Sequence, residues 1–116
     1  MKDRMNTPEL IDWAKVRELC NDVGRDGLDE VIALFMEEAE TAMQTIGMAE
    51  DLESALHFVK GCALNLGFDR FTTLAAEGEA LAARGLPDQV DLTQLGQVYR
   101  ESRDLFLAEF SMRIAA

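Results

Sequence analysis

The hydrophobic residues of this chain recur at intervals of three and four positions, which is the spacing of one face of an α-helix. Five stretches carry the pattern, over about residues 8–23, 27–47, 50–66, 68–84 and 91–114. Proline occurs only at positions 8 and 87, and runs of β-branched residues are scarce. The pattern therefore predicts an all-α protein.

Glycine and proline separate the predicted helices. Residues 7–9 (Thr-Pro-Glu) are typical of an N-cap followed by proline in the first turn, and residues 24–27 (Gly-Arg-Asp-Gly) interrupt the pattern. Gly67 and residues 85–88 (Gly-Leu-Pro-Asp) predict two further helix ends. Because these connections are short, consecutive helices should run antiparallel. We predict an antiparallel up-and-down four-helix bundle with an additional short N-terminal helix.

Each long helix has an apolar stripe that should face a shared core. The stripes are Val31, Phe35, Ala42 and Ile46; Leu52, Leu56, Val59, Ala63 and Leu66; Phe71, Leu74, Leu81 and Ala82; and Leu95, Tyr99, Phe106 and Phe110. A chain of 116 residues is long enough for one such core and too short for two. We expect a single domain over residues 1–116, with the bundle core at about 27–114 and the N-terminal helix at about 8–23.

The charge balance restricts the partners. Lys and Arg number 11 against 22 Asp and Glu, so the formal charge is −11, which repels nucleic acid and anionic lipid. The first residues are charged and polar, and no run approaches ~18 apolar residues. We expect a cytoplasmic monomer with no nucleic-acid or membrane partner. Cys20 and Cys62 lack CxxC spacing, and we expect reduced structural thiols.

His57 is the only histidine of the chain, and it lies off the apolar stripe of its helix. At 100° per residue it should face outward, together with Lys60, Gly61 and Leu64. The neutral ring nitrogen of an imidazole is nucleophilic near pH 7 and can both accept and release a group. An outward imidazole is therefore a candidate for covalent chemistry rather than for the core.

Two neighbours of His57 are unusual for an ordinary helix surface. Gly61 stands deep inside the helix, where glycine costs ~1 kcal/mol relative to alanine, and clearance for an approaching partner would explain it. Lys60 is the first basic residue after Arg25, in a stretch that contains nine acidic residues. Because positions i and i+3 share a helix face, its ammonium can lie beside any negative charge that the imidazole acquires.

Two further residues of this face are candidates for contacts. Leu64, two turns after His57, should be an exposed apolar side chain of the kind that a protein-docking surface uses. Glu53, one turn before His57, is a candidate to accept a hydrogen bond from the ring and orient it.

Residues 55–67 (Ala-Leu-His-Phe-Val-Lys-Gly-Cys-Ala-Leu-Asn-Leu-Gly) closely resemble the signature of histidine phosphotransfer (HPt) domains. In that signature an active histidine is followed by Lys-Gly, small residues and a later glycine. The resemblance implies that His57 is phosphorylated, that Lys60 stabilises the phosphoryl group and that Gly61 leaves room for the partner. Val59 departs mildly, since leucine is commoner there, which alters packing rather than chemistry.

The resemblance also implies partners. These would be the receiver domain of a response regulator, a hybrid sensor kinase, or both, with a receiver aspartate that donates or accepts the phosphoryl group. Mg²⁺ would be held by the receiver, so no metal or cofactor is expected on this chain. The sequence contains no GxxxxGK[ST] motif and no glycine-rich nucleotide lid, so we expect a carrier and not a kinase.

Two alternatives remain open at this stage. A metal-binding bundle would draw on the helical carboxylates and on the Glu53-x-x-x-His57 pair, but di-iron bundles use paired Glu-x-x-His motifs and this chain has one histidine. A bundle of the same fold that only docks or dimerises is the second alternative. The combination of His57, Lys60 and Gly61 argues against it, because such a module would be more stable with alanine at position 61. The cognate kinase and regulator and the direction of phosphoryl flow are not encoded in any recognisable motif.

Overall fold

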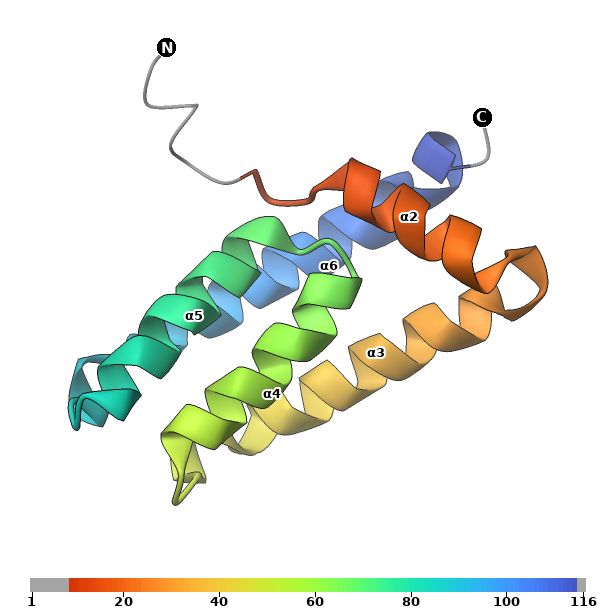
Figure 1. Cartoon of the computed structure of the whole chain (residues 1–116). Helices are drawn as coiled ribbons and strands as arrows, with labels where there is room; N and C mark the ends of the chain where they lie inside the picture. Colours follow the sequence, from red (N-terminus) through yellow and green to blue (C-terminus); the bar gives the residue numbers. More distant parts are fainter. Residues whose placement is uncertain (1–8, 115–116) are drawn as a thin grey trace, which may run out of the picture.

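The computed structural model describes residues 9–114, and within this range the chain is all-α, as predicted (Figure 1). The elements are α2 (Trp13–Val23), α3 (Arg25–Thr45), the 3-10 turn η1 (Ile46–Met48), α4 (Leu52–Asn65), α5 (Asp69–Ala83), the 3-10 turn η2 (Pro87–Gln89) and α6 (Leu92–Ile114). Helices α3 to α6 form the bundle, in which α4 lies between α3 and α5, and α5 packs on α6. Helix α2 lies across one end.

The N-terminal helix begins later than predicted, at Trp13 rather than near residue 8. Asp12 is its N-cap, and the Asp12 carboxylate accepts hydrogen bonds from the backbone N–H groups of Ala14 and Lys15 at 3.1 and 3.3 Å. This cap fixes the first turn of the helix at Trp13. The predicted start near residue 8 was therefore wrong. Of the predicted cap at residues 7–9, positions 7 and 8 lie outside the described residues, and Glu9 is not helical.

Residues 9–12 instead form an extended strap along the start of α5. The carbonyls of Glu9 and Leu10 accept from the N–H groups of Arg70 and Asp69, each at 3.1 Å. Helix α5 has no side-chain N-cap, so the strap satisfies backbone donors that a helix start otherwise leaves unpaired. The strap is held in turn by Asp12, whose N–H donates to the carbonyl of Gly67 at 2.7 Å.

Helix α3 begins at Arg25, so the predicted break over residues 24–27 is confined to Gly24. Its buried face also differs from the predicted stripe, because Val31, Phe35 and Ala42 are only partly buried. The buried positions are Leu28, Ile32, Met36 and Ala39. Both sets are apolar, so the apolar arc of α3 is wide, and only packing against neighbouring helices selects its centre.

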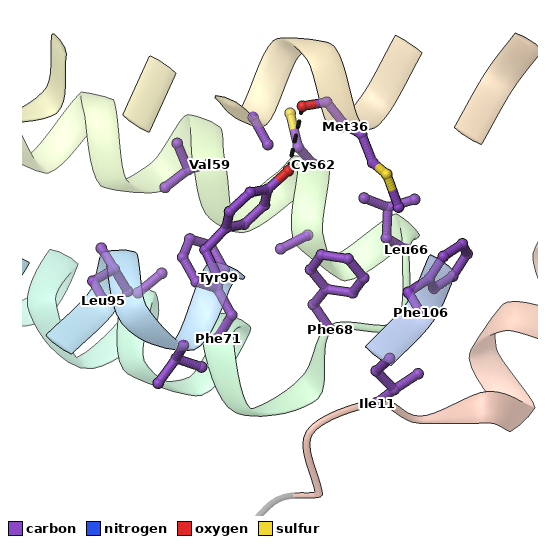
Figure 2. Close-up of a cluster of buried hydrophobic side chains, with 14 of the residues drawn as sticks. Ile11, Met36, Val59, Cys62, Leu66, Phe68, Phe71, Leu95, Tyr99 and Phe106 are labelled. Carbon is purple, nitrogen blue, oxygen red and sulfur yellow. Dashed lines mark hydrogen bonds between the residues drawn. The ribbon is translucent and has the colours of Figure 1, made fainter. Parts of the chain in front are cut away.

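The stripes of α4 and α6 supply much of the core as predicted (Figure 2), but in the predicted stripe of α5 only Phe71 is buried, and Leu74, Leu81 and Ala82 are partly buried. Phe71, Leu95, Tyr99 and Phe106 are buried, and Phe68 lies among them with its ring centroid 5.8 Å from those of both Tyr99 and Phe106. The Tyr99 hydroxyl donates to the carbonyl of Met36 at 3.3 Å, which links α6 to α3. The aromatic cluster therefore joins the α4–α5 connection to α3 and α6.

The turn between α4 and α5 requires glycine, as the predicted helix end at Gly67 implies. Gly67 has a φ of +74°, and a Cβ atom there would lie 2.8 Å from the carbonyl oxygen of Asp12. The N–H of Phe68 donates to Ala63, and that of Gly67 donates to Leu64, which is a Schellman motif. The turn and the strap are thus packed against each other.

Both cysteines are free thiols, Cys62 buried and Cys20 partly buried. Burial raises the pKa of each thiol above its ordinary value. No helix within residues 9–114 is long and apolar enough to span a bilayer.

Candidate functional site

Helix α4 presents His57 to solvent. The helix is capped by Asp51, whose carboxylate accepts from the backbone N–H of Ser54 at 3.1 Å. Its rotation is fixed by Leu56 and Val59, which are completely buried. With this rotation the side chain of His57 is 70% exposed, so the outward orientation predicted from the apolar stripe is confirmed.

A carboxylate from the neighbouring helix joins the two predicted chemical groups of α4. One oxygen of Glu79, on α5, lies 2.9 Å from Nδ1 of His57, and the other lies 2.7 Å from Nζ of Lys60. The Glu79 side chain is only 20% exposed. The ammonium of Lys60, above all, and the ring of His57 hold the pKa of Glu79 below its usual range. Glu79 is therefore an ionised bridge at neutral pH.

The ionised bridge determines the tautomer of the ring. A carboxylate without a proton can only accept hydrogen bonds, so Nδ1 of His57 must carry the hydrogen that lies between it and Glu79. In the neutral ring the lone pair then resides on Nε2. The site consequently holds a mostly exposed imidazole in which a carboxylate of another helix leaves the lone pair on Nε2.

Glu79 is the residue of this site that analysis of the sequence missed, since Glu53 was expected to orient the ring. Glu53 is exposed, and among residues 9–114 no hydrogen bond joins it to His57. The missed signal is Gly78, inside the predicted helix over 68–84. A Cβ atom at Gly78 would lie 3.0 Å from Val90 and 3.2 Å from Leu56, so glycine allows α5 to approach α4 closely and brings Glu79 to His57.

Gly61 opens the surface beside His57. A Cβ atom at this position would have nothing within 4 Å, so neither packing nor backbone conformation requires glycine. Leu64, on the same side of α4, is 48% exposed, as predicted. Phe58 is 49% exposed and was not singled out from the sequence. The face of α4 around His57 thus combines an open gap with exposed apolar side chains.

A metal centre is not assembled by these groups. Within the part of the chain that the structure describes, no group of three or more His, Cys, Asp or Glu side chains is placed to hold a metal ion. Glu53 and His57, the pair considered for a metal site, are therefore not part of such a group.

A comparison with family models matches the Hpt domain model over residues 30–113. The chain belongs to the Hpt domain family. The match runs from within α3 to the last turn of α6 and includes α4 and α5, which carry His57, Lys60 and Glu79. As an HPt domain, the protein has a phosphotransfer role in phosphorelay signalling, and domains of this family interact with receiver domains and kinases. Comparisons with curated proteins and with solved structures give no significant match.

Proposed function

We propose that this HPt domain carries a phosphoryl group on Nε2 of His57 and exchanges it with the aspartate of a receiver domain. The observation that carries the proposal is the hydrogen bond of 2.9 Å between Nδ1 and Glu79 on an imidazole that is 70% exposed. It leaves Nε2 as the nucleophile and leaves the ring accessible to a second protein. We also propose that the transfer takes place in the cytoplasm and that the chain acts as a monomer.

The proposed transfer forms one bond to phosphorus and breaks another, and it consumes no further reactant. The Nε2 lone pair of His57 attacks the phosphorus of the receiver's aspartyl phosphate, and the phosphorus–oxygen bond breaks with its electrons returning to the aspartate carboxylate. Nδ1 keeps its hydrogen, so the phosphorylated ring bears a positive charge. Glu79 stabilises that charge, in the way that a buried carboxylate stabilises an imidazolium in hydrolase triads. The reverse reaction returns the group by the same path.

Lys60 supplies positive charge on the same side of the ring. The Lys60 ammonium has three N–H donors, and it contacts one oxygen of the Glu79 carboxylate. A phosphoryl group brings roughly two negative charges near neutral pH, and the flexible lysine stem can move an ammonium donor toward them. The Mg²⁺ that the transfer uses would be held by the receiver, and this chain would contribute no metal ligand or other cofactor.

The proposal is tested by phosphorylating the full chain from labelled, phosphorylated receiver domains and locating the group. We expect a product in which nitrogen-15 and phosphorus-31 NMR place the phosphoryl group on Nε2 of His57. A phosphoryl group on Nδ1, or on another residue, would contradict the tautomer derived from Glu79. Docking of a receiver without any transfer would instead support the alternative of a non-catalytic docking module.

Replacing Glu79 should slow transfer without unfolding the bundle. Glu79→Ala removes the acceptor for Nδ1, and we expect transfer to fall about ten- to a hundredfold, as for carboxylates that orient histidines at metal sites. Glu79→Gln retains an oxygen acceptor, so transfer should recover to within about tenfold of wild type. Single-turnover transfer kinetics from a phosphorylated receiver measure both variants.

The control for Glu79 is Glu77→Ala, an exposed carboxylate two positions earlier on α5. This variant should transfer at the wild-type rate. Nitrogen-15 chemical shifts of the His57 ring provide the readout that a purely structural role would not move, since the Nδ1–H tautomer should lose population in Glu79→Ala. An unchanged tautomer together with an unchanged rate would remove Glu79 from the site.

Enlarging position 61 should separate stability from transfer. Gly61→Ala should raise the free energy of unfolding by up to ~1 kcal/mol, because a Cβ atom meets open space and alanine favours the helix. Gly61→Phe should reduce transfer from a receiver by about a hundredfold, since a displacement near 1 Å at a reacting centre has such an effect. Thermal melts and single-turnover kinetics measure the two quantities, and wild-type transfer in Gly61→Phe would show that the gap is not used.

A further inference from the structure

A second surface feature lies on the face of the bundle opposite His57. There α3, η1 and α6 line an open groove with a volume of ≈ 510 Å³. None of the residues that line the groove is on α4 or α5, the helices that carry His57 and Glu79, so the groove belongs to the other side of the four-helix bundle. Binding sites in proteins commonly enclose about 300–1,000 Å³, and this groove falls within that range.

The lining of the groove mixes apolar and polar residues, and a glycine in the middle of α6 adds no side chain to it. Met43, Ile46 and Leu92 contribute to the lining. A Cβ atom at Gly96 would meet only Nη1 of Arg100 at 3.5 Å and Cε of Met43 at 4.0 Å, which are ordinary contacts. Packing does not require glycine here, and alanine would favour the helix. As at Gly61, the missing side chain keeps accessible space open.

The lining of this groove includes a cation that has no counterion among the described residues. Arg100 is exposed, and no ion pair within residues 9–114 involves it. Arg103, at the groove edge, already pairs with Glu40 at 3.5 Å and with Asp104 at 3.2 Å. In a chain of net charge −11, an arginine with no ion pair among the described residues, next to the apolar side chains of Met43 and Leu92, is complementary to a ligand that has both acidic and apolar groups.

Another hollow of the same bundle is lined by residues of different charge. It has a volume of ≈ 730 Å³, and its ionisable lining residues are all acidic: Glu50, Asp51, Glu53 and Asp88. The groove between α3 and α6 instead has two arginines against one carboxylate, that of Glu40. Of these two hollows, the Arg100 groove is the one whose charge favours an acidic segment.

We propose that the groove between α3 and α6 binds an amphipathic helical segment of a partner protein. The apolar side chains of that segment lie over Met43 and Gly96, and a carboxylate of the segment forms a charge-assisted pair with Arg100. The bound segment leaves His57 uncovered on the opposite face. A partner tethered in this way gains effective concentration at the phosphotransfer site without competing for it.

The first test uses two designed peptides of about 18 residues, since shorter isolated helices are marginal in water. One has leucines at helical spacing flanked by glutamates, and the other has lysine in place of each glutamate. We expect the acidic peptide to shift the backbone NMR signals of Gly96 and Arg100 in the full chain, but not that of His57. It should bind at least about tenfold more tightly than the lysine peptide.

Three variants locate the site by fluorescence anisotropy with the labelled acidic peptide. Gly96→Leu fills the groove and Arg100→Glu reverses its charge, and each should weaken binding at least about tenfold. Arg17→Glu, a matched change at an exposed arginine of α2, should bind like the wild type. Circular dichroism melts should show that all three variants fold, and transfer at His57 should be unchanged in each.

Three results would overturn the groove proposal. They are equal binding of the acidic and lysine peptides, an equal loss in Arg100→Glu and Arg17→Glu, and the absence of any shift at Gly96 and Arg100 at millimolar acidic peptide. None of them depends on whether His57 is phosphorylated, so the groove and the proposed transfer function fail or stand separately.

Discussion

His57→Gln should lower the rate of phosphoryl transfer by at least about 10³-fold, because substituting a catalytic nucleophile commonly lowers the rate by this factor or more. Glutamine has a polar side chain that can still meet Glu79 through its amide N–H, but it has no nucleophilic nitrogen. The measurement is the label that the chain acquires from each phosphorylated receiver domain of the source organism, compared at short times with wild type.

The variant should remain folded, which makes the loss interpretable. His57 is 70% exposed, and surface substitutions usually change the free energy of unfolding by less than about 0.5 kcal/mol. A circular dichroism melt provides this control. Label on His57→Gln at the wild-type rate would place the phosphoacceptor elsewhere, whereas label on neither protein from any receiver would favour the docking-module alternative.

Phe68→Ala should be the most destabilising of the changes considered for this bundle. Phe68 is fully buried, and its ring contacts those of Tyr99 and Phe106 where the α4–α5 turn meets α6 (Figure 2). Truncating a buried phenylalanine costs about 3–5 kcal/mol, a large part of the ~5–15 kcal/mol that stabilises a small domain. Urea unfolding should show this loss, and the melting temperature should fall by more than about 10 °C.

Phe58→Ala is the matched control for Phe68, because it makes the same change at a phenylalanine of α4 that is 49% exposed. We expect it to lower the free energy of unfolding by less than about 1 kcal/mol. Equal losses in the two variants would mean that the aromatic cluster around Phe68 does not hold the α4–α5 turn.

The sequence predicted most of what depends on neighbouring positions along one helix. The period of the apolar residues placed five helices, and the stripe through Leu56 and Val59 oriented α4 so that His57 faces outward. The glycine at position 67 marked a helix end that the structure shows as a left-handed turn. These features are local, because helix periodicity and turn conformation are set within a few residues.

The errors arose where one element depends on another. The start of the N-terminal helix was placed too early because residues 9–12 bond to the start of α5, which no local pattern announces. The stripe of α3 was centred on Val31 and Phe35 rather than on Ile32 and Met36, because its apolar arc is wider than the surface that its neighbours cover.

The sequence by itself determined an all-α fold, the outward imidazole of His57 and the lysine and glycine beside it, since all of these follow from spacing within one helix. Only the tertiary structure decided which carboxylate meets the ring. Glu79 is 22 positions from His57, and their contact exists because Gly78 lets α5 pack closely on α4. Contacts between helices depend on how the whole bundle packs, and that packing determines which nitrogen of the neutral His57 ring carries the lone pair.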